Sequence, residues 1–171
     1  MGLLEPVYAA PAGTHPLLAG LLGTMHERHF DMLNLVSGMP EGALAWAPGP
    51  EMACLAGLAA HILEVEVFAG RVAAGEDLRR EGGNGPPPHA GADAAALAAA
   101  IDDADRFLKG VLGGLRGEVF SRTQPGEERS VGAAIVEEFD HAAMHYGQMQ
   151  ITRHLWEAAH PAFEATYNHW R

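Results

Sequence analysis

The sequence predicts an all-α protein built as a four-helix bundle. Hydrophobic residues recur at steps of three and four in four long segments, and this spacing aligns side chains along one face of a helix. Runs of alternating β-branched residues, which would indicate strands, are absent from the sequence. Four amphipathic helices bury their hydrophobic faces by packing together, so a bundle is the expected architecture.

The first two helices have recognisable ends. The first is expected at about residues 15–38, with Thr14 as its N-cap and a proline just inside it. The second is expected at about residues 51–74, after an Ala-Pro-Gly-Pro turn, and Gly75 closes it. Both segments are long enough to cross a small domain.

The last two helices are predicted in the same way. The third, at about residues 92–116, is rich in alanine, and Asp93 is a suitable N-cap. The fourth, at about residues 130–157, begins at Ser130 and ends before Pro161. We expect all four helices to belong to a single domain that spans the whole chain, residues 1–171.

The connection between the second and third helices is long and cannot be helical. Residues 76–91 are rich in glycine and include three consecutive prolines. Sixteen extended residues reach about 50 Å, whereas a helix of about 24 residues is about 36 Å long. This linker can therefore cross the bundle and let the two helices run parallel. The connections near 39–50 and 117–130 are also long, so length permits the crossover without requiring it.

Composition excludes several classes of partner. The chain has 11 basic and 22 acidic residues, a net charge of −11, which argues against nucleic acid because phosphate binding needs clustered Lys and Arg. No segment reaches the ~18 uninterrupted apolar residues of a membrane span, and the N-terminus lacks the features of a secretory signal. We expect a soluble, cytoplasmic protein. Its single cysteine, Cys54, excludes an internal disulfide and is expected to be a packed core thiol.

Three histidines lie on the predicted apolar faces. His61 is the only polar member of a stripe in the second helix that otherwise contains Cys54, Leu58, Val65, Phe68 and Val72. His141 and His145 lie one turn apart in the fourth helix, so their β-carbons are separated by roughly 5–6 Å. A buried ring nitrogen without a partner is costly, so three inward histidines indicate a bound metal ion.

The ligand count favours a reactive site. Neutral imidazoles suit Zn, Ni, Cu and Fe, and three of them leave at least one coordination position open. Structural zinc sites usually fill all four positions with protein ligands, whereas catalytic sites keep one open. The His-x-x-x-His spacing alone is weak evidence. The third histidine on another helix and the following Tyr-Gly-Gln strengthen it.

Other polar residues near these positions are candidates for catalysis. His29 lies on the inward stripe of the first helix, where it can be a fourth ligand, an acid or base near the ion, or a core histidine bonded to a backbone carbonyl. Gln148, one turn after His145, can orient a ligand or contact substrate, as can Glu138. We predict His29 and Gln148 as the catalytic residues. Gly147 falls on the outer side of the fourth helix, where close packing against a neighbouring chain or the C-terminal tail, or simple tolerance, explains it.

The chain resembles the DinB/YfiT-like family of metal-dependent enzymes from about residue 15 to 157. The matching residues are Trp46-Ala-Pro48, Leu58-Ala-Ala-His61-Ile-Leu-Glu64, Asp140-His141-Ala-Ala-Met-His145-Tyr-Gly147-Gln148 and Arg153. The resemblance implies a bundle with up-down-down-up topology and metal ligands at His61, His141 and His145, with Zn or Ni as the ion. Some relatives are transferases or an isomerase that use a low-molecular-weight thiol. The histidines at 26 and 29 and the tail after Pro161 depart from the family pattern.

These observations lead to three hypotheses of function. The first is a metal-dependent transferase or hydrolase, in which a divalent ion activates water or a small thiol against a small-molecule substrate. The second is a non-catalytic protein that binds metal or a small molecule. The third is a haem-binding bundle with two histidines as axial ligands. We also expect a homodimer, because the aromatic tail with Phe163, Tyr167 and Trp170 can cover a helix of its own chain or of a partner.

Overall fold

The computed structural model describes residues 4–5, 7–40, 42–76, 93–123 and 128–163. These residues form four long α-helices and contain no strand. The helices are α1 (Pro16–Val36), α2 (Leu55–Ala74), α3 (Ala94–Leu112) and α4 (Val131–Ala159), with short 3-10 helices η1 (Ala43–Ala45) and η2 (Gly117–Phe120) in the connections. The all-α prediction is confirmed, and no described helix is long and apolar enough to cross a membrane.

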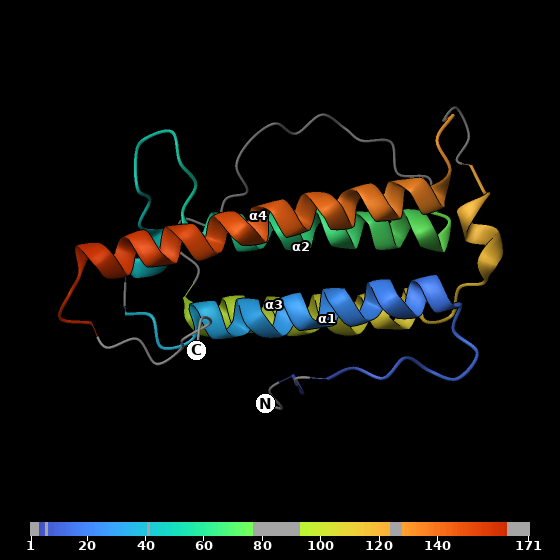
Figure 1. Ribbon diagram of the computed structural model, residues 1–171, viewed down its shortest axis with the longest axis horizontal. Helices are drawn as coiled ribbons and strands as arrows, with labels where there is room; N and C mark the ends of the chain where they lie inside the picture. Colours follow the sequence, from blue (N-terminus) through green and yellow to red (C-terminus); the bar gives the residue numbers. More distant parts are fainter. Residues whose placement is uncertain (1–3, 6, 41, 77–92, 124–127, 164–171) are drawn as a thin grey trace.

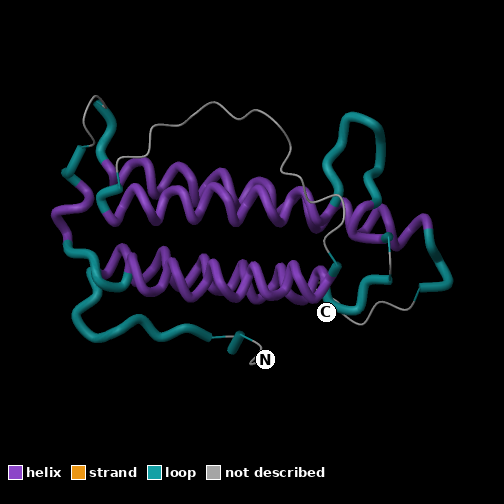
Figure 2. The backbone as a smooth tube through the Cα atoms, turned by 180° about the vertical axis from the view of Figure 1, so that it is seen from behind, coloured by secondary structure: helices purple, strands orange, loops and turns teal. Residues whose placement is uncertain are grey.

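The four helices form a bundle with up-down-down-up topology. Figure 1 shows α1 and α4 running in one direction and α2 and α3 in the other. Figure 2 shows the same helices from behind, as one layer of α2 and α4 and a second layer of α1 and α3. Contacts join α2 to both α3 and α4, and α1 to both α3 and α4. The predicted parallel pair of second and third helices is therefore confirmed, while the linker at 77–92 lies outside the described residues.

Helix ends follow the sequence at most positions. Asp93 caps α3 by accepting a hydrogen bond from the Ala96 N–H at 2.7 Å, and Ser130 caps α4 in the same way. Gly75 ends α2 with a φ of 97°, a conformation that favours glycine. The prediction of Thr14 as the first cap is wrong, because the ring nitrogen Nδ1 of His15 accepts the Leu17 N–H at 3.3 Å instead.

Two helices are shorter than predicted. α2 begins at Leu55 because Cys54 is its N-cap, with Sγ accepting the Gly57 N–H at 3.4 Å. Cys54 is half-buried and packs against the core, in agreement with the prediction of a packed thiol, and its sulfur also caps the helix. α3 ends at Leu112 because two consecutive glycines follow, and the N–H of Gly113 bonds back to a carbonyl of the last turn. The one-domain prediction over residues 1–171 stays a prediction.

The hydrophobic core runs the length of the bundle. At one end α1 and α3 pack against α2 and the start of α4, and at the other end η1 and Trp156 of α4 join them. The apolar stripe predicted for the first helix is buried as expected: Leu18, Leu22, Met25, Met32 and Val36 are all fully buried. Between these two apolar regions the interior contains charged side chains, which the apolar stripes did not predict.

Candidate metal centre

The three predicted ligands converge between α2 and α4. The Nε2 atom of His141 lies 3.1 Å from Nε2 of His61 and 2.9 Å from Nε2 of His145. The ring centroids are 4.5 to 5.3 Å apart, and one nitrogen from each ring lies within 4.8 Å of the other two. We call these residues the histidine triad. Among the His, Cys, Asp and Glu residues that the structure describes, these three are close enough together to hold a metal ion.

The histidine triad lies at the edge of the bundle and not in its centre. All three rings are half-buried, whereas Ile62 and Glu66 of α2 are fully buried. The innermost stripe of α2 is thus shifted by one residue from the stripe that contains His61. The prediction that the histidines face the centre of the core is therefore wrong. The residues on both sides of His61 are apolar, so the sequence alone does not decide which face of α2 points to the core. The edge position leaves each of the three histidines partly exposed to solvent.

Hydrogen bonds alone do not account for the convergence. Oε1 of Gln148 lies 2.8 Å from Nδ1 of His145, so it accepts that N–H and leaves Nε2 of His145 with a lone pair in the neutral tautomer. Nε2 of His141 then needs a proton to bond His145, and the same atom needs a lone pair to accept from His61. In a neutral ring this nitrogen carries either a proton or a lone pair, but not both. It therefore cannot donate to one neighbouring histidine and accept from the other.

A cation resolves this conflict. Three imidazoles that each bring a ring nitrogen within 4.8 Å of the other two match the way neutral imidazoles bind transition metals. Two nitrogens that bind a tetrahedral zinc at ~2.0–2.1 Å lie about 3.3 Å apart. The N–N distances of 2.9 and 3.1 Å within the triad are close to that value. The residues present therefore fit a divalent ion with three protein ligands.

Gln148 is positioned to orient one ligand. Its side chain is exposed on α4, one turn beyond His145, and its amide oxygen fixes the proton on Nδ1 of that ring. This is the arrangement by which a neighbouring acceptor orients a histidine ligand and raises its basicity. Glu138, one turn before His141, is buried, whereas Glu64, one turn after His61, is exposed. The role predicted for Gln148 in contacting substrate stays a prediction.

His29 belongs to a different part of the interior. Its Nε2 lies 2.7 Å from Oε2 of Glu66, and its Nδ1 lies 3.3 Å from Oδ1 of Asp105. The ring is fully buried, and it is not a member of the group that can hold a metal ion. Of the three interpretations of His29, a core histidine fits the geometry, with carboxylates as its partners in place of a backbone carbonyl. These contacts do not test catalysis, so the catalytic role of His29 stays a prediction.

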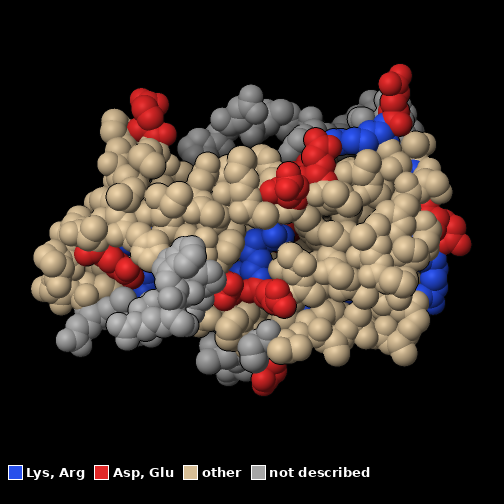
Figure 3. Space-filling model, in the orientation of Figure 1, with Lys and Arg blue, Asp and Glu red and all other residues tan. Residues whose placement is uncertain are grey.

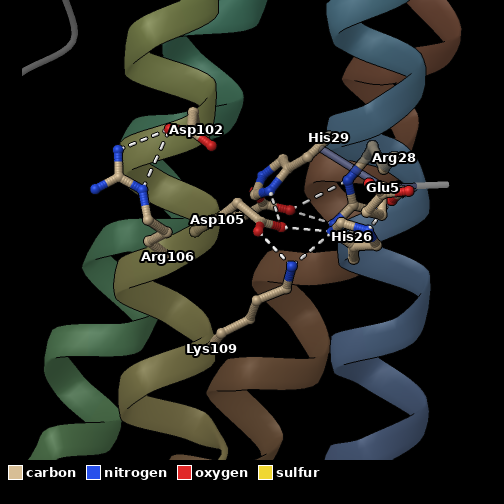
Figure 4. A network of polar contacts seen from close by, with 9 residues as sticks. Glu5, His26, Arg28, His29, Asp102, Asp105, Arg106 and Lys109 are labelled. Atoms are coloured by element: carbon tan, nitrogen blue, oxygen red, sulfur yellow. Dashed lines mark hydrogen bonds and ion pairs between the residues drawn. The ribbon is translucent and has the colours of Figure 1, made fainter. Parts of the chain in front are cut away.

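A buried polar network surrounds His29 (Figure 4). Its members are His26, Arg28, His29, Glu66, Asp105 and Lys109. Arg28 donates from Nε to Oε1 of Glu66 at 3.1 Å, and a terminal guanidinium nitrogen contacts the same oxygen. Lys109 forms an ion pair with Asp105 at 2.5 Å. The network thus ties α1 to α2 through Glu66 and α1 to α3 through Asp105.

Opposite charges face one another in this network. Burial by itself raises the pKa of Asp105, but hydrogen bonds from two histidines and Lys109 outweigh burial and lower the pKa to about 2. Burial also raises the pKa of Glu66, and the charges and hydrogen bonds of His29 and Arg28 reverse that effect and lower it. Burial lowers the pKa of His29, yet the charge of Glu66 and the bonds to both carboxylates raise it. The two carboxylates therefore favour the imidazolium form of His29 over the neutral ring.

The raised pKa of His29 predicts a loss of stability at alkaline pH. A group whose pKa is higher in the folded chain stabilises the fold below its unfolded pKa, here 6.5, and that contribution disappears as pH rises through the folded-state value. We expect the difference in unfolding free energy between wild type and His29→Gln to shrink as pH rises above 6.5. Urea denaturation at a series of pH values measures it, and a difference independent of pH would contradict the assignment.

The sequence contained a signal for this network, namely a single acidic residue on an otherwise apolar stripe in each of two helices. In α2 the fully buried stripe is Leu55, Ala59, Ile62, Glu66, Ala69 and Ala73, with the same steps of four and three as the stripe through His61. In α3 the buried stripe is Leu97, Ile101, Asp105, Leu108 and Leu112. Each stripe has one acidic member. Two lone carboxylates on apolar stripes indicate buried partners as strongly as lone histidines do.

Comparison with known proteins identifies the family of the chain and a solved structure with a similar fold. The sequence model described as the DinB superfamily matches residues 24–149. The crystal structure of a conserved protein from Enterococcus faecalis superimposes with a TM-score of 0.63 at 19% sequence identity, and the match covers 83% of this chain and 96% of that chain. At that identity the likeness concerns the fold. No curated protein matches the sequence.

Proposed function

This chain belongs to the DinB superfamily, and from that premise we propose that it is a metal-dependent enzyme acting on a small molecule. The observation that carries the proposal is the convergence of three Nε2 atoms from α2 and α4. Three protein ligands leave room for a further group at the ion. The half-buried position of the histidine triad supports access for such a group.

In this proposal His61, His141 and His145 hold a zinc or nickel ion. Such an ion supplies Lewis acidity, which lowers the pKa of a bound water or thiol or polarises a substrate oxygen. Gln148 keeps His145 in the tautomer that presents Nε2 to the ion. The buried polar network fixes α1, α2 and α3 relative to one another, and α2 carries both Glu66 of that network and His61 of the triad.

We propose that the reaction is either transfer of a group from the substrate to a thiol or hydrolysis of the substrate by water. In both cases the nucleophile is not a side chain of the protein. The only cysteine of the sequence, Cys54, caps α2 through its sulfur. A thiol nucleophile is therefore supplied by a low-molecular-weight co-substrate, and the alternative nucleophile is water. An ion held by the histidine triad would have a coordination position left for either nucleophile.

Turnover with a panel of low-molecular-weight thiols and small electrophiles tests this proposal. We expect metal-loaded wild type either to join a thiol to at least one electrophile or to hydrolyse that electrophile. We expect His145→Ala to lose this activity. A matched control is His154→Ala, which removes an exposed histidine of the same helix. Metal binding without turnover across the panel would favour the non-catalytic metal-binding protein instead.

Loss of the Gln148 amide is expected to weaken metal binding. In Gln148→Leu the Nδ1 proton of His145 loses its acceptor, and such changes beside a ligand typically cost 10–100-fold in metal affinity. The control is Gln150→Leu, because the Gln150 amide donates to the Tyr146 hydroxyl at 3.0 Å and has no bond to the triad. Competition titration against a chromogenic chelator measures both affinities. Equal affinities in the two variants would remove Gln148 from the site.

A further inference from the structure

Arg28 carries a positive charge in the interior of the bundle. The Lys and Arg side chains that are visible in Figure 3 are at the surface, where water solvates them. The side chain of Arg28 is buried, and a buried charge is stable only where protein groups replace the lost water. Its charged partner is the carboxylate of Glu66 on α2. Arg28 also contacts a third helix, α4.

Two contacts join Arg28 to Phe139 of α4. Nη1 of Arg28 donates to the Phe139 carbonyl oxygen at 3.5 Å, and Cζ lies 5.9 Å from the centre of the Phe139 ring. The hydrogen bond is long, but the distance to the ring is within the range of a cation–π contact. The guanidinium is planar and its N–H groups point in fixed directions. Contacts with Glu66 and Phe139 at the same time therefore restrict how α2 and α4 lie relative to each other.

Both contact points lie close to the histidine triad along their helices. Glu66 is five residues after His61 on α2. Phe139 is two residues before His141 on α4. At 1.5 Å per residue, these separations are about 7.5 Å and about 3 Å along the helix axes. Because α2 and α4 run in opposite directions, both separations point to the same end of the bundle (Figure 1). Arg28 thus bridges the two ligand-bearing helices less than two turns from the triad.

The geometry of the triad depends on how α2 packs against α4. His141 and His145 are held at their spacing by a single helix, one turn apart. His61 comes from the other helix, and its Nε2 lies 3.1 Å from Nε2 of His141. A slide of one helix by about 1 Å moves this ring by a similar amount, whereas ligands have to be held within ~0.5 Å of their binding geometry.

We propose that Arg28 is a positioning residue of the metal centre, which keeps α2 and α4 at the spacing that lets His61 share an ion with His141 and His145. This inference rests on the proposed function, because it assigns Arg28 a part in the same site. Arg28 belongs to α1, which contributes no residue to the triad. Metal affinity is thus expected to depend on a helix that holds none of the three ligands.

The zinc affinity of Arg28→Met, measured by competition with a chromogenic chelator, tests this proposal. We expect the dissociation constant to rise about tenfold, at the lower end of the range for residues that orient metal ligands. The matched control is Ile101→Ala, which removes buried core atoms from α3 and destabilises the fold. A variant that stays almost wholly folded keeps the affinity of the folded state, so we expect Ile101→Ala to bind zinc as wild type does.

A double variant separates positioning from stability. Arg28→Met leaves the carboxylate of Glu66 without its guanidinium partner, so it also destabilises the fold. Arg28→Met with Glu66→Leu removes both charges and is expected to be more stable than Arg28→Met. We expect its zinc affinity to stay about tenfold weaker than that of wild type, because the link to Phe139 is still missing.

Cobalt(II) provides a second readout, because its visible absorption depends on coordination geometry. At saturating cobalt we expect an altered spectrum in both Arg28 variants and the wild-type spectrum in Ile101→Ala. Wild-type affinity in Arg28→Met or in the double variant would overturn this inference and leave the proposed function standing. An equal loss of affinity in Ile101→Ala would overturn it as well, since the loss would then follow stability. A wild type that binds no zinc would overturn both the proposed function and this inference.

Discussion

Glu66→Ala is expected to destabilise the fold by about 3–5 kcal/mol, because it leaves the guanidinium of Arg28 and the ring of His29 buried without their shared carboxylate. Glu66 is fully buried, so the two groups that it leaves behind are shielded from bulk solvent. Urea denaturation of wild type and variant at neutral pH measures the difference in unfolding free energy.

A surface pair provides the matched control for Glu66. Glu137 is 62% exposed in its side chain and pairs with Arg129, so Glu137→Ala is expected to cost no more than ~1 kcal/mol. The double variant Arg28→Met with Glu66→Leu removes both charges and is expected to be more stable than Glu66→Ala alone. A cost for Glu66→Ala as small as that of Glu137→Ala would show that the network contributes little to stability.

Zinc or nickel is expected to stabilise wild type against unfolding by about 2.7–4.1 kcal/mol at free-metal concentrations of 100 to 1,000 times the dissociation constant. The reason is that the three imidazoles are brought together only in the folded chain, within 4.8 Å of one another. Thermal unfolding with and without metal measures the shift. His145→Ala is expected to lose most of it.

His154→Ala is the control for this metal-dependent shift. His154 is on α4 as well, and its side chain is 51% exposed and lies 3.7 Å from Glu157. Its removal changes the number of histidines in the unfolded chain by one, as His145→Ala does, but leaves the triad complete. Equal shifts in the two variants would mean that the metal binds elsewhere or binds the unfolded chain.

The fold was largely predictable because its signals are local. Apolar steps of three and four marked all four helices, and Asp93, Ser130 and Gly75 marked three of their ends. The errors came from competing local groups: His15 took the cap expected of Thr14, and Cys54 capped α2 four residues later than expected. Such choices depend on backbone angles that the residue types leave open.

The candidate site was predictable in its residues but not in its depth. The steps through His61 and the steps through Glu66 are identical along α2, so periodicity could not decide which stripe faces the core. The packing of α2 against α3 and α4 decides it, and places Glu66 inside and His61 at the edge. The sequence also could not predict that Arg28 and His29 of α1 pair with Glu66, because this pairing depends on which helices become neighbours.

The central claim is that the histidine triad binds one metal ion per folded chain. Metal content of purified protein, measured by mass spectrometry after equilibration with limiting zinc or nickel and removal of free ions, tests it most directly. We predict about one ion per chain in wild type and in His154→Ala, and a negligible amount in His61→Ala and His145→Ala. Negligible metal in wild type, or equal metal in all four proteins, would contradict the claim.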